Sequence, residues 1–144
     1  MKRWLGLDLG HVRIGVALSD SLGMTSQPLK VIQSEGTQKD LITLGELVNE
    51  HEVTQVIIGL PINMDGTESK QTQKIRDFST KLSARLNVPV FFVDERLTSR
   101  QAERMMSESG VTSKKQRGKV DQVAAAILLQ AALKGAPLTE VPKS

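Results

Sequence analysis

Three extended segments follow one another at the start of this 144-residue chain, before any helical pattern appears. Residues 3–9 (RWLGLDL) and 13–19 (RIGVALS) are largely apolar and are separated by a short turn at Gly10–Val12, which predicts a β-hairpin. Residues 24–33 (MTSQPLKVIQ) form the third segment, and Pro28 indicates an edge strand because proline cannot donate to a β-ladder. The chain is therefore expected to begin with a three-stranded antiparallel unit.

Helical and extended patterns alternate over the rest of the chain. The expected elements are a helix from an N-cap at Thr37 to about His51, a strand over 55–59 (QVIIG), a helix over 67–86, a strand over 88–93 (VPVFFV), a helix from a capping box at Thr98 and Gln101 to about Ser109, and an apolar helix from about Gly118 to Gly135. This order predicts an α/β fold with a mixed five-stranded sheet, three antiparallel strands and then two parallel ones, flanked by helices.

The composition is that of an ordinary globular protein, with 39% hydrophobic and 24% charged residues, and the length fits one domain over residues 1–144. There is no cysteine, which excludes disulfide bonds and thiolate chemistry. The N-terminal residues lack the apolar segment of a signal peptide, and no stretch is long enough to span a membrane. We therefore expect a cytoplasmic protein without a membrane partner.

Three carboxylates stand out by their positions. Asp8 interrupts an apolar strand, where a carboxylate costs several kcal/mol unless a cation or hydrogen bonds compensate it. Glu95 follows the VFFV strand, although it could simply pair with Arg96 or Arg100. Asp121 lies near the start of the last helix, where an acid commonly complements the helix dipole. Of the three, Asp8 is the hardest to explain as a structural residue.

Sites in α/β sheets gather at the carboxyl ends of the parallel strands, so these three acids are candidates for one site. Clustered carboxylates bind hard divalent ions, and a pair of Mg²⁺ or Mn²⁺ ions can catalyse phosphodiester cleavage. Soft-metal sites are disfavoured because the chain has no cysteine and only two histidines. One of them, His11, is expected to be a solvated turn residue, with substrate contact as the alternative.

Basic residues cluster in the C-terminal third, although the net charge is only +3. Seven of the 19 Lys and Arg residues lie between positions 96 and 119, against two acids, which suits a polyanion such as nucleic acid. The loop SKKQRGK (113–119) directly precedes Asp121. A second loop, GLPINMDGTES (59–69), leads to an expected helix start at Thr67 that could attract a phosphate, or it is a plain connection. Aromatic residues make up only 3% of the chain, which argues against a base-stacking platform.

Four stretches together carry a family pattern: GLDLGHVRIGVALSD (6–20), GLPINMDGT (59–67), VDERLTS (93–99) and GKVDQVAAAILLQ (118–130). Through them the chain resembles the YqgF family, also called RuvX, the Holliday-junction-resolvase-like proteins. The resemblance implies a ribonuclease H-like fold and a nuclease that processes the 5′ end of pre-16S rRNA in ribosome biogenesis. It also implies that the family's acidic set corresponds to Asp8, Glu95 and Asp121.

The chain departs from the pattern of the wider ribonuclease H-like superfamily in its fourth strand, IIGLP. Many of these nucleases place an acid at the end of this strand, and here there is none. The fifth strand would supply it instead. Asp94 and Glu95 are adjacent and point to opposite faces of a continuing strand, so only one of them is expected to face Asp8. We favour Glu95.

The preferred hypothesis is therefore a hydrolase of phosphodiester bonds, a two-metal endonuclease that acts on structured RNA, with pre-ribosomal particles as partners. Asp8, Glu95 and Asp121 would hold Mg²⁺ or Mn²⁺. Phosphates would be bound by six basic residues: Arg13, Arg96, Lys114, Lys115, Arg117 and Lys119.

Three alternatives remain open. A resolvase-like endonuclease would cut branched DNA and would favour a symmetric dimer, although no apolar stripe marks an interface and a monomer or weak homodimer is expected. A non-catalytic RNA-binding assembly factor would use the same surface without hydrolysis. An actin-like or sugar-kinase-like ATPase would need a second such domain, which 144 residues do not supply.

Overall fold

The computed structural model describes residues 2–98 and 117–143, and within helix α4 it describes the side chains from residue 123 onward. The elements are β1 (Trp4–Leu9), β2 (Arg13–Ser19), β3 (Ser26–Gln33), α1 (Thr37–Glu50), β4 (Gln55–Leu60), α2 (Lys70–Arg85), β5 (Val90–Asp94), the short 3₁₀ helix η1 (Glu95–Leu97), α4 (Arg117–Leu133) and β6 (Leu138–Glu140). The helix expected from Thr98 to about Ser109 lies outside the described residues.

The strands form one sheet in the order β3-β2-β1-β4-β5-β6. β1 pairs antiparallel with β2 and parallel with β4, while β5 is parallel to β4. The predicted mixed sheet is confirmed, and so is the edge position of β3 with Pro28. The expected strand number of five was wrong, because the short β6 pairs antiparallel with β5 at the other edge. The three residues of β6, LTE, are too few to show the alternation of apolar and polar residues that predicts a strand.

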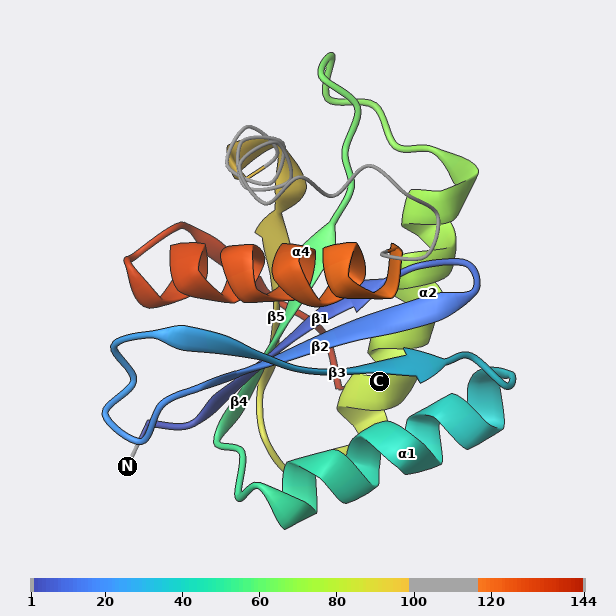
Figure 1. The fold of residues 1–144 in the computed structure, drawn as a ribbon. Coiled ribbons are helices and arrows are strands. Elements are labelled where there is room, and N and C mark those ends of the chain that lie inside the picture. Colours follow the sequence, from blue (N-terminus) through green and yellow to red (C-terminus); the bar gives the residue numbers. More distant parts are fainter. Residues whose placement is uncertain (1, 99–116, 144) are drawn as a thin grey trace.

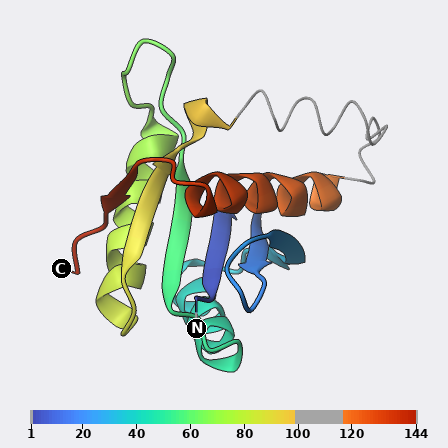
Figure 2. The same cartoon turned by 90° about the vertical axis from the view of Figure 1, so that its left-hand side faces the viewer.

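Helices α1 and α2 cover one face of the sheet and α4 covers the other (Figures 1 and 2). Leu5, Leu7 and Leu9 of β1 belong to the large core beneath α1 and α2. The intervening positions of β1 face α4, as Gly6 shows: a Cβ on it would lie 2.8 Å from the Cβ of Leu129. Asp8 shares that face by the same alternation, so the sheet presents it beneath α4.

Both helices between the strands bury the apolar faces predicted from their spacing, but their starts differ from the prediction. Gly36, with a φ of 104°, is the N-cap of α1, and Thr37 is the first helical residue. α2 begins at Lys70 and not at Thr67, because Ser69 and Thr72 form a capping box. A positive φ at the cap favours glycine, which explains why the threonine is displaced by one position.

Candidate active site

Two of the three acids singled out in the sequence come together at the carboxyl ends of β1 and β5, the two strands that flank β4. On β4, a Cβ added to Gly59 would lie 2.6 Å from Oε1 of Glu95 and 2.9 Å from Cδ2 of Leu128. The Glu95 carboxylate therefore lies over β4 on the α4 face, the face that Asp8 shares. The absent side chain at residue 59 provides the space that the carboxylate occupies.

The electrostatics of Glu95 reflect this position. Burial, together with the negative charges of Asp8 and Asp94, raises its pKa to about 7. A carboxyl group whose pKa is shifted by burial and by a neighbouring carboxylate is typical of functional sites. A cation bound between Asp8 and Glu95 would offset both effects and allow both groups to ionise.

The structure also distinguishes the two adjacent acids, Asp94 and Glu95. The Asp94 carboxylate accepts hydrogen bonds from the backbone N–H of Arg96 (2.9 Å) and from its Nη2 (2.7 Å). The hydrogen bond from the Arg96 side chain is the main reason that the pKa of Asp94 is lowered. Asp94 thus caps η1 and pairs with Arg96, whereas Glu95 lies on the side of the sheet that carries Asp8.

Asp121, the third acid, lies on α4, and its side chain is outside the described residues. Position 121 precedes Ala125 by one helical turn, so the two positions share a face of the helix. The carbonyl oxygen of Ala125 is 3.0 Å from the Cβ that Gly6 would carry, which places that face against β1. Among the described side chains, no three acids or histidines lie close enough together to hold a metal. The described part of the candidate site is therefore the pair of Asp8 and Glu95, whose charges interact.

Two of the six expected phosphate-binding residues have described side chains. Arg13 begins β2 beside the turn in which the N–H of Gly10 donates to its carbonyl oxygen. Arg96 is exposed, pairs with Asp94, and donates from Nη1 to the carbonyl oxygen of Asn63 at 3.5 Å. The others lie outside the described residues, entirely for Lys114 and Lys115 and by their side chains for Arg117 and Lys119.

The loop between β4 and α2 corrects a further expectation. Thr67 starts no helix: its N–H donates to Oδ1 of Asp65 at 3.0 Å, which leaves no free helix N-terminus for a phosphate there. The loop projects beyond the end of the sheet (Figure 2). Met64 near its tip is 85% exposed.

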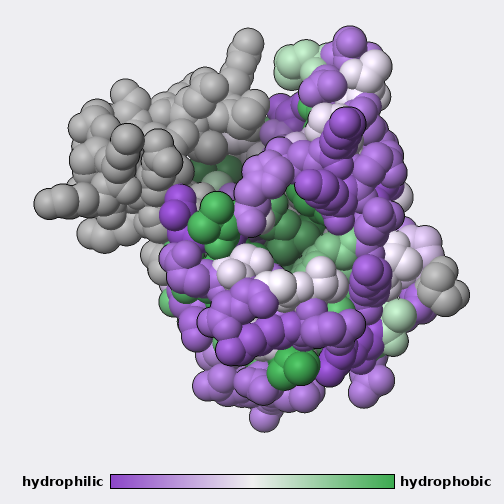
Figure 3. Space-filling view, turned by 90° about the vertical axis from the view of Figure 1, so that its right-hand side faces the viewer, coloured by the Kyte–Doolittle hydropathy of each residue, from purple (hydrophilic) through white to green (hydrophobic). Residues whose placement is uncertain are grey.

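A groove that the sequence did not reveal lies on the opposite face of the sheet, between the β1–β2 turn, the start of α1 and one side of α2. Its volume is about 410 Å³, and Figure 3 shows it as a hollow with a hydrophobic floor. His11 is exposed, as expected of a turn residue, and lies at one end of this groove. The helical spacing of Phe78 with Ile75 and Leu82 predicts a core residue, and no local pattern shows that its ring also lines an opening.

Solved structures that share this architecture are Holliday-junction resolvases. A Thermus thermophilus RuvC in complex with Holliday junction substrate superposes with a TM-score of 0.60 at 14% identity, covering 97% of this chain and 99% of that chain. The Fowlpox virus resolvase, also in complex with junction DNA, gives a TM-score of 0.56 at 13% identity, with coverages of 92% and 97%. At such identities the likeness concerns the fold alone: the chain has the ribonuclease H-like fold of the RuvC-type resolvases.

The chain belongs to the RuvX family. The family model described as "RuvX: Holliday junction resolvase" matches residues 2–135. A relative from Anaeromyxobacter dehalogenans is 44% identical over 128 residues, which are 89% of this chain and 93% of the relative. One from Syntrophus aciditrophicus is 41% identical over 140 residues, covering 97% and 93%. Both are described as "Putative pre-16S rRNA nuclease". The family resemblance seen in the four sequence motifs is thereby confirmed.

No helix in residues 2–98 and 117–143 combines the length and the apolar character that a membrane span requires.

Proposed function

We propose that this protein is a metal-dependent endonuclease that processes the 5′ end of pre-16S rRNA in the cytoplasm, on pre-ribosomal particles. The observation that carries the proposal is the carboxylate pair, with Glu95 held over Gly59 on the face that carries Asp8. The description of relatives at 44% and 41% identity as pre-16S rRNA nucleases supports the choice of substrate.

The donor set fits a hard divalent cation such as Mg²⁺ or Mn²⁺. Asp8 and Glu95 offer carboxylate oxygens, the ligands that these ions prefer. The pKa of Glu95 is raised by burial and by the negative charge of Asp8, and a bound cation would offset both effects. Asp8, Glu95 and, from α4, Asp121 would hold the ions. When bound, such ions activate water and stabilise the leaving oxygen of a phosphodiester.

The remaining residues would orient the substrate. Asp94 fixes the Arg96 guanidinium at the end of β5, next to the acid pair, and the Asn63 carbonyl contacts the same group. Arg96 would bind a phosphate adjacent to the one that is cut, because a guanidinium presents several donors to phosphate oxygens. Arg13 and the basic residues Lys114, Lys115, Arg117 and Lys119 would hold more of the backbone.

Cleavage of a 5′-extended 16S precursor RNA tests the proposal, with a synthetic four-way DNA junction in parallel. Each substrate is incubated with Mg²⁺, Mn²⁺ or EDTA and with the wild type, Asp8→Asn, Glu95→Gln or Glu46→Gln. Glu46 is an exposed acid on α1 and serves as the matched control. Metal-dependent cutting of the RNA that is lost in both site variants but kept in the control is expected.

Other outcomes contradict the proposal in distinct ways. Cutting that survives Asp8→Asn would exclude this site. Preferential cutting of the junction would identify a DNA resolvase, in line with the RuvC-like fold. Tight RNA binding without cutting at any metal concentration would leave the non-catalytic assembly factor.

A further inference from the structure

We propose that the groove between α1, α2 and the β1–β2 turn binds an unpaired nucleotide of the RNA, with its base on Phe78 and its phosphate near Lys74 and Lys81. The inference rests on the proposed function for the identity of the polymer. It adds a binding site on the face of the sheet opposite the acid pair.

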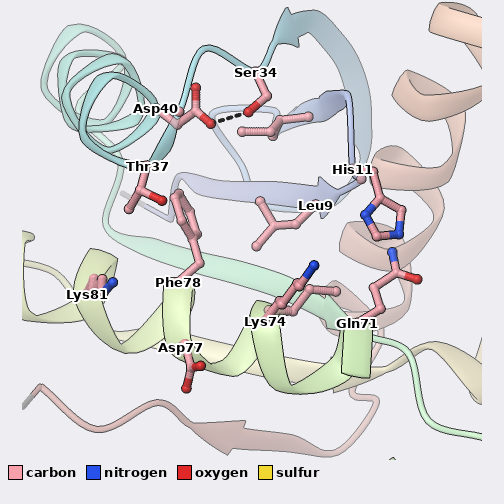
Figure 4. A pocket seen from close by; sticks show the side chains of 14 residues that line it. Leu9, His11, Ser34, Thr37, Asp40, Gln71, Lys74, Asp77, Phe78 and Lys81 are labelled. Carbon is pink, nitrogen blue, oxygen red and sulfur yellow. Dashed lines mark hydrogen bonds between the residues drawn. The ribbon is translucent and has the colours of Figure 1, made fainter. Parts of the chain in front are cut away.

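The floor of the groove is apolar and includes an aromatic ring. Leu9 and Ile14 come from the hairpin, and Ile75 and Phe78 come from α2. Figure 4 shows the Phe78 ring rising from α2 between Thr37 and the strands. Phe78 is only partly buried, so its ring meets both the core and the opening. A base stacked on an aromatic side chain gains about 1–3 kcal/mol irrespective of its identity.

The charges around the groove suit a phosphate. Lys74 and Lys81 lie along α2, both exposed, and both line the groove. Two acids also belong to the lining, and their charges partly offset those of the lysines. Asp77 turns away from the opening, as Figure 4 shows. Asp40 is buried, and its carboxylate accepts hydrogen bonds from the Ser34 hydroxyl (2.5 Å) and the Glu35 N–H (3.0 Å).

The start of α1 adds to this positive field. Gly36 and Thr37 line the groove, and the helix has no side-chain cap at this end. The first backbone N–H groups of a helix carry a partial positive charge and bind anions. The two lysines and the helix end thus surround an apolar floor, the combination that a nucleotide requires.

The groove lies at the same end of β1 as Asp8, on the other face of the sheet. Leu9, Gly10 and His11 line it, and Asp8 is the residue immediately before them. An RNA strand bound at Asp8 can therefore pass over the β1–β2 turn and place a neighbouring nucleotide in the groove. His11 and Gln71, side by side at this end (Figure 4), offer hydrogen-bonding groups to a base.

The size and rim of the groove favour a nucleotide over a second copy of the chain. A volume of about 410 Å³ lies in the range of small-molecule pockets. A stable dimer buries on the order of 1,200 Å² or more around an apolar centre. Here a charged rim encloses a narrow apolar floor (Figure 3).

Direct binding to a short fluorescein-labelled single-stranded RNA, followed by anisotropy in EDTA across a salt series, tests the inference. The variants are Phe78→Leu, which keeps an apolar side chain but removes the ring, and the pair Lys74→Gln/Lys81→Gln. The pair Lys70→Gln/Lys134→Gln changes the same charge at exposed lysines outside the groove and is the control. Thermal melting checks that each variant is folded.

We expect Phe78→Leu to weaken RNA binding about five- to tenfold. The Lys74/Lys81 pair should weaken it similarly and reduce the slope of log Kd against log salt by about one to two. The control should stay within roughly twofold of the wild type. An RNA that carries one 4-thiouridine should crosslink to a peptide containing Phe78. Binding of the groove variants equal to that of the control would overturn the inference.

The proposed function and the groove can fail separately. Asp8→Asn should abolish cleavage, and in that background Phe78→Leu should still weaken binding to this RNA. If the wild type cuts the precursor but the groove variants bind like the control, only the groove is refuted. If the groove variants lose binding although the wild type cuts nothing, only the nuclease is refuted. A dimer in sedimentation velocity that Phe78→Leu dissociates would make the groove a self-interface and overturn its assignment to RNA.

Discussion

The Glu95 carboxylate and the α-carbon of Gly59 are packed so closely that a methyl group on residue 59 would come within 2.6 Å of Oε1. A side chain at position 59 and the observed placement of Glu95 are therefore mutually exclusive. Gly59, near the end of β4, thus makes room for Glu95, the acid that follows β5.

Gly59→Ala should reduce metal-dependent cleavage at least about tenfold while the protein remains folded. The new methyl group displaces the ends of two flexible side chains, Glu95 and Leu128, so the stability loss should be modest, about 1–2 kcal/mol. Gly45→Ala is the control, because nothing lies within 4 Å of its Cβ in α1 and alanine favours a helix by about 0.5–1 kcal/mol. Cleavage rates and melting temperatures of both variants measure the difference. Full activity of Gly59→Ala would show that the observed position of Glu95 is not required.

The stability of the metal-free protein should fall as the pH rises through the window between the unfolded and folded pKa of Glu95. The folded pKa is about 7, raised from 4.5 by burial and by Asp8, so the native state binds more protons than the unfolded state between these values. The stabilisation is complete below pH 4.5 and is lost by pH 7, with an upper bound of about 3 kcal/mol. Urea unfolding in EDTA at several pH values measures it.

Glu95→Gln should flatten that pH dependence, because the amide does not titrate. Mg²⁺ added above pH 7 should stabilise the wild type more than Glu95→Gln. The same pH slope in both proteins would assign the titration to another group.

Asp94→Asn should weaken substrate binding more than it slows the cleavage step. The variant removes the charge partner of Arg96, whose guanidinium lies 2.7 Å from Oδ2 of Asp94. Because the pair is partly exposed, the stability loss should be only about 0.5–1 kcal/mol. Single-turnover cleavage at several RNA concentrations separates an increase in KM from a decrease in the maximal rate. Arg96→Gln should show the same pattern, and a purely catalytic defect in either variant would contradict a positioning role.

Lys143→Met should destabilise the fold without affecting cleavage. The Lys143 ammonium donates to three carbonyl oxygens where α2 ends, those of Ser83 (3.1 Å), Leu86 (3.2 Å) and Val88 (2.5 Å). Cations at a helix C-terminus stabilise by roughly 0.3–1 kcal/mol, more when partly buried, so a loss of about 1–2 kcal/mol and a few degrees in Tm is expected. Lys30→Met changes an exposed lysine on β3, away from any helix end, and should leave Tm unchanged. Equal Tm values for the two variants would contradict this role.

The parts of the fold that the sequence predicted are those set by local chemistry. Pro28 indicated the edge strand, and the spacing of Leu41, Leu44 and Leu47 indicated the buried face of α1. Asp8 and Glu95 were found because a carboxylate at the end of an apolar strand requires an explanation. The alternation of side chains along a strand also predicts that Asp94 and Glu95 point to opposite faces of the sheet. Which acid lies on which face is shown only by the structure, in which Asp94 contacts Arg96.

The parts that escaped prediction depend on neighbours that are distant in the sequence or on one backbone angle. β6 is too short to be recognised from its sequence, and it is a strand because it pairs with the open edge of β5. Thr67 resembles a helix cap in the sequence, but in the structure its N–H donates to Asp65 and the capping box forms at Ser69. The groove arises from the packing of α1 against α2 and from the apolar side chains that their separation leaves uncovered.

The close approach of α4 to Gly6 and Gly59 has a consequence for the order in which the site matures during translation. Asp8 and Glu95 leave the ribosome with the strands, whereas Leu128, which packs beside Gly59, follows only with the last helix. A nascent chain that ends just after η1 thus exposes both carboxylates to water, where the part of the burial of Glu95 that α4 provides is missing. Part of the burial that raises the pKa of Glu95 comes from α4, so the site reaches its final electrostatics only when the last helix docks.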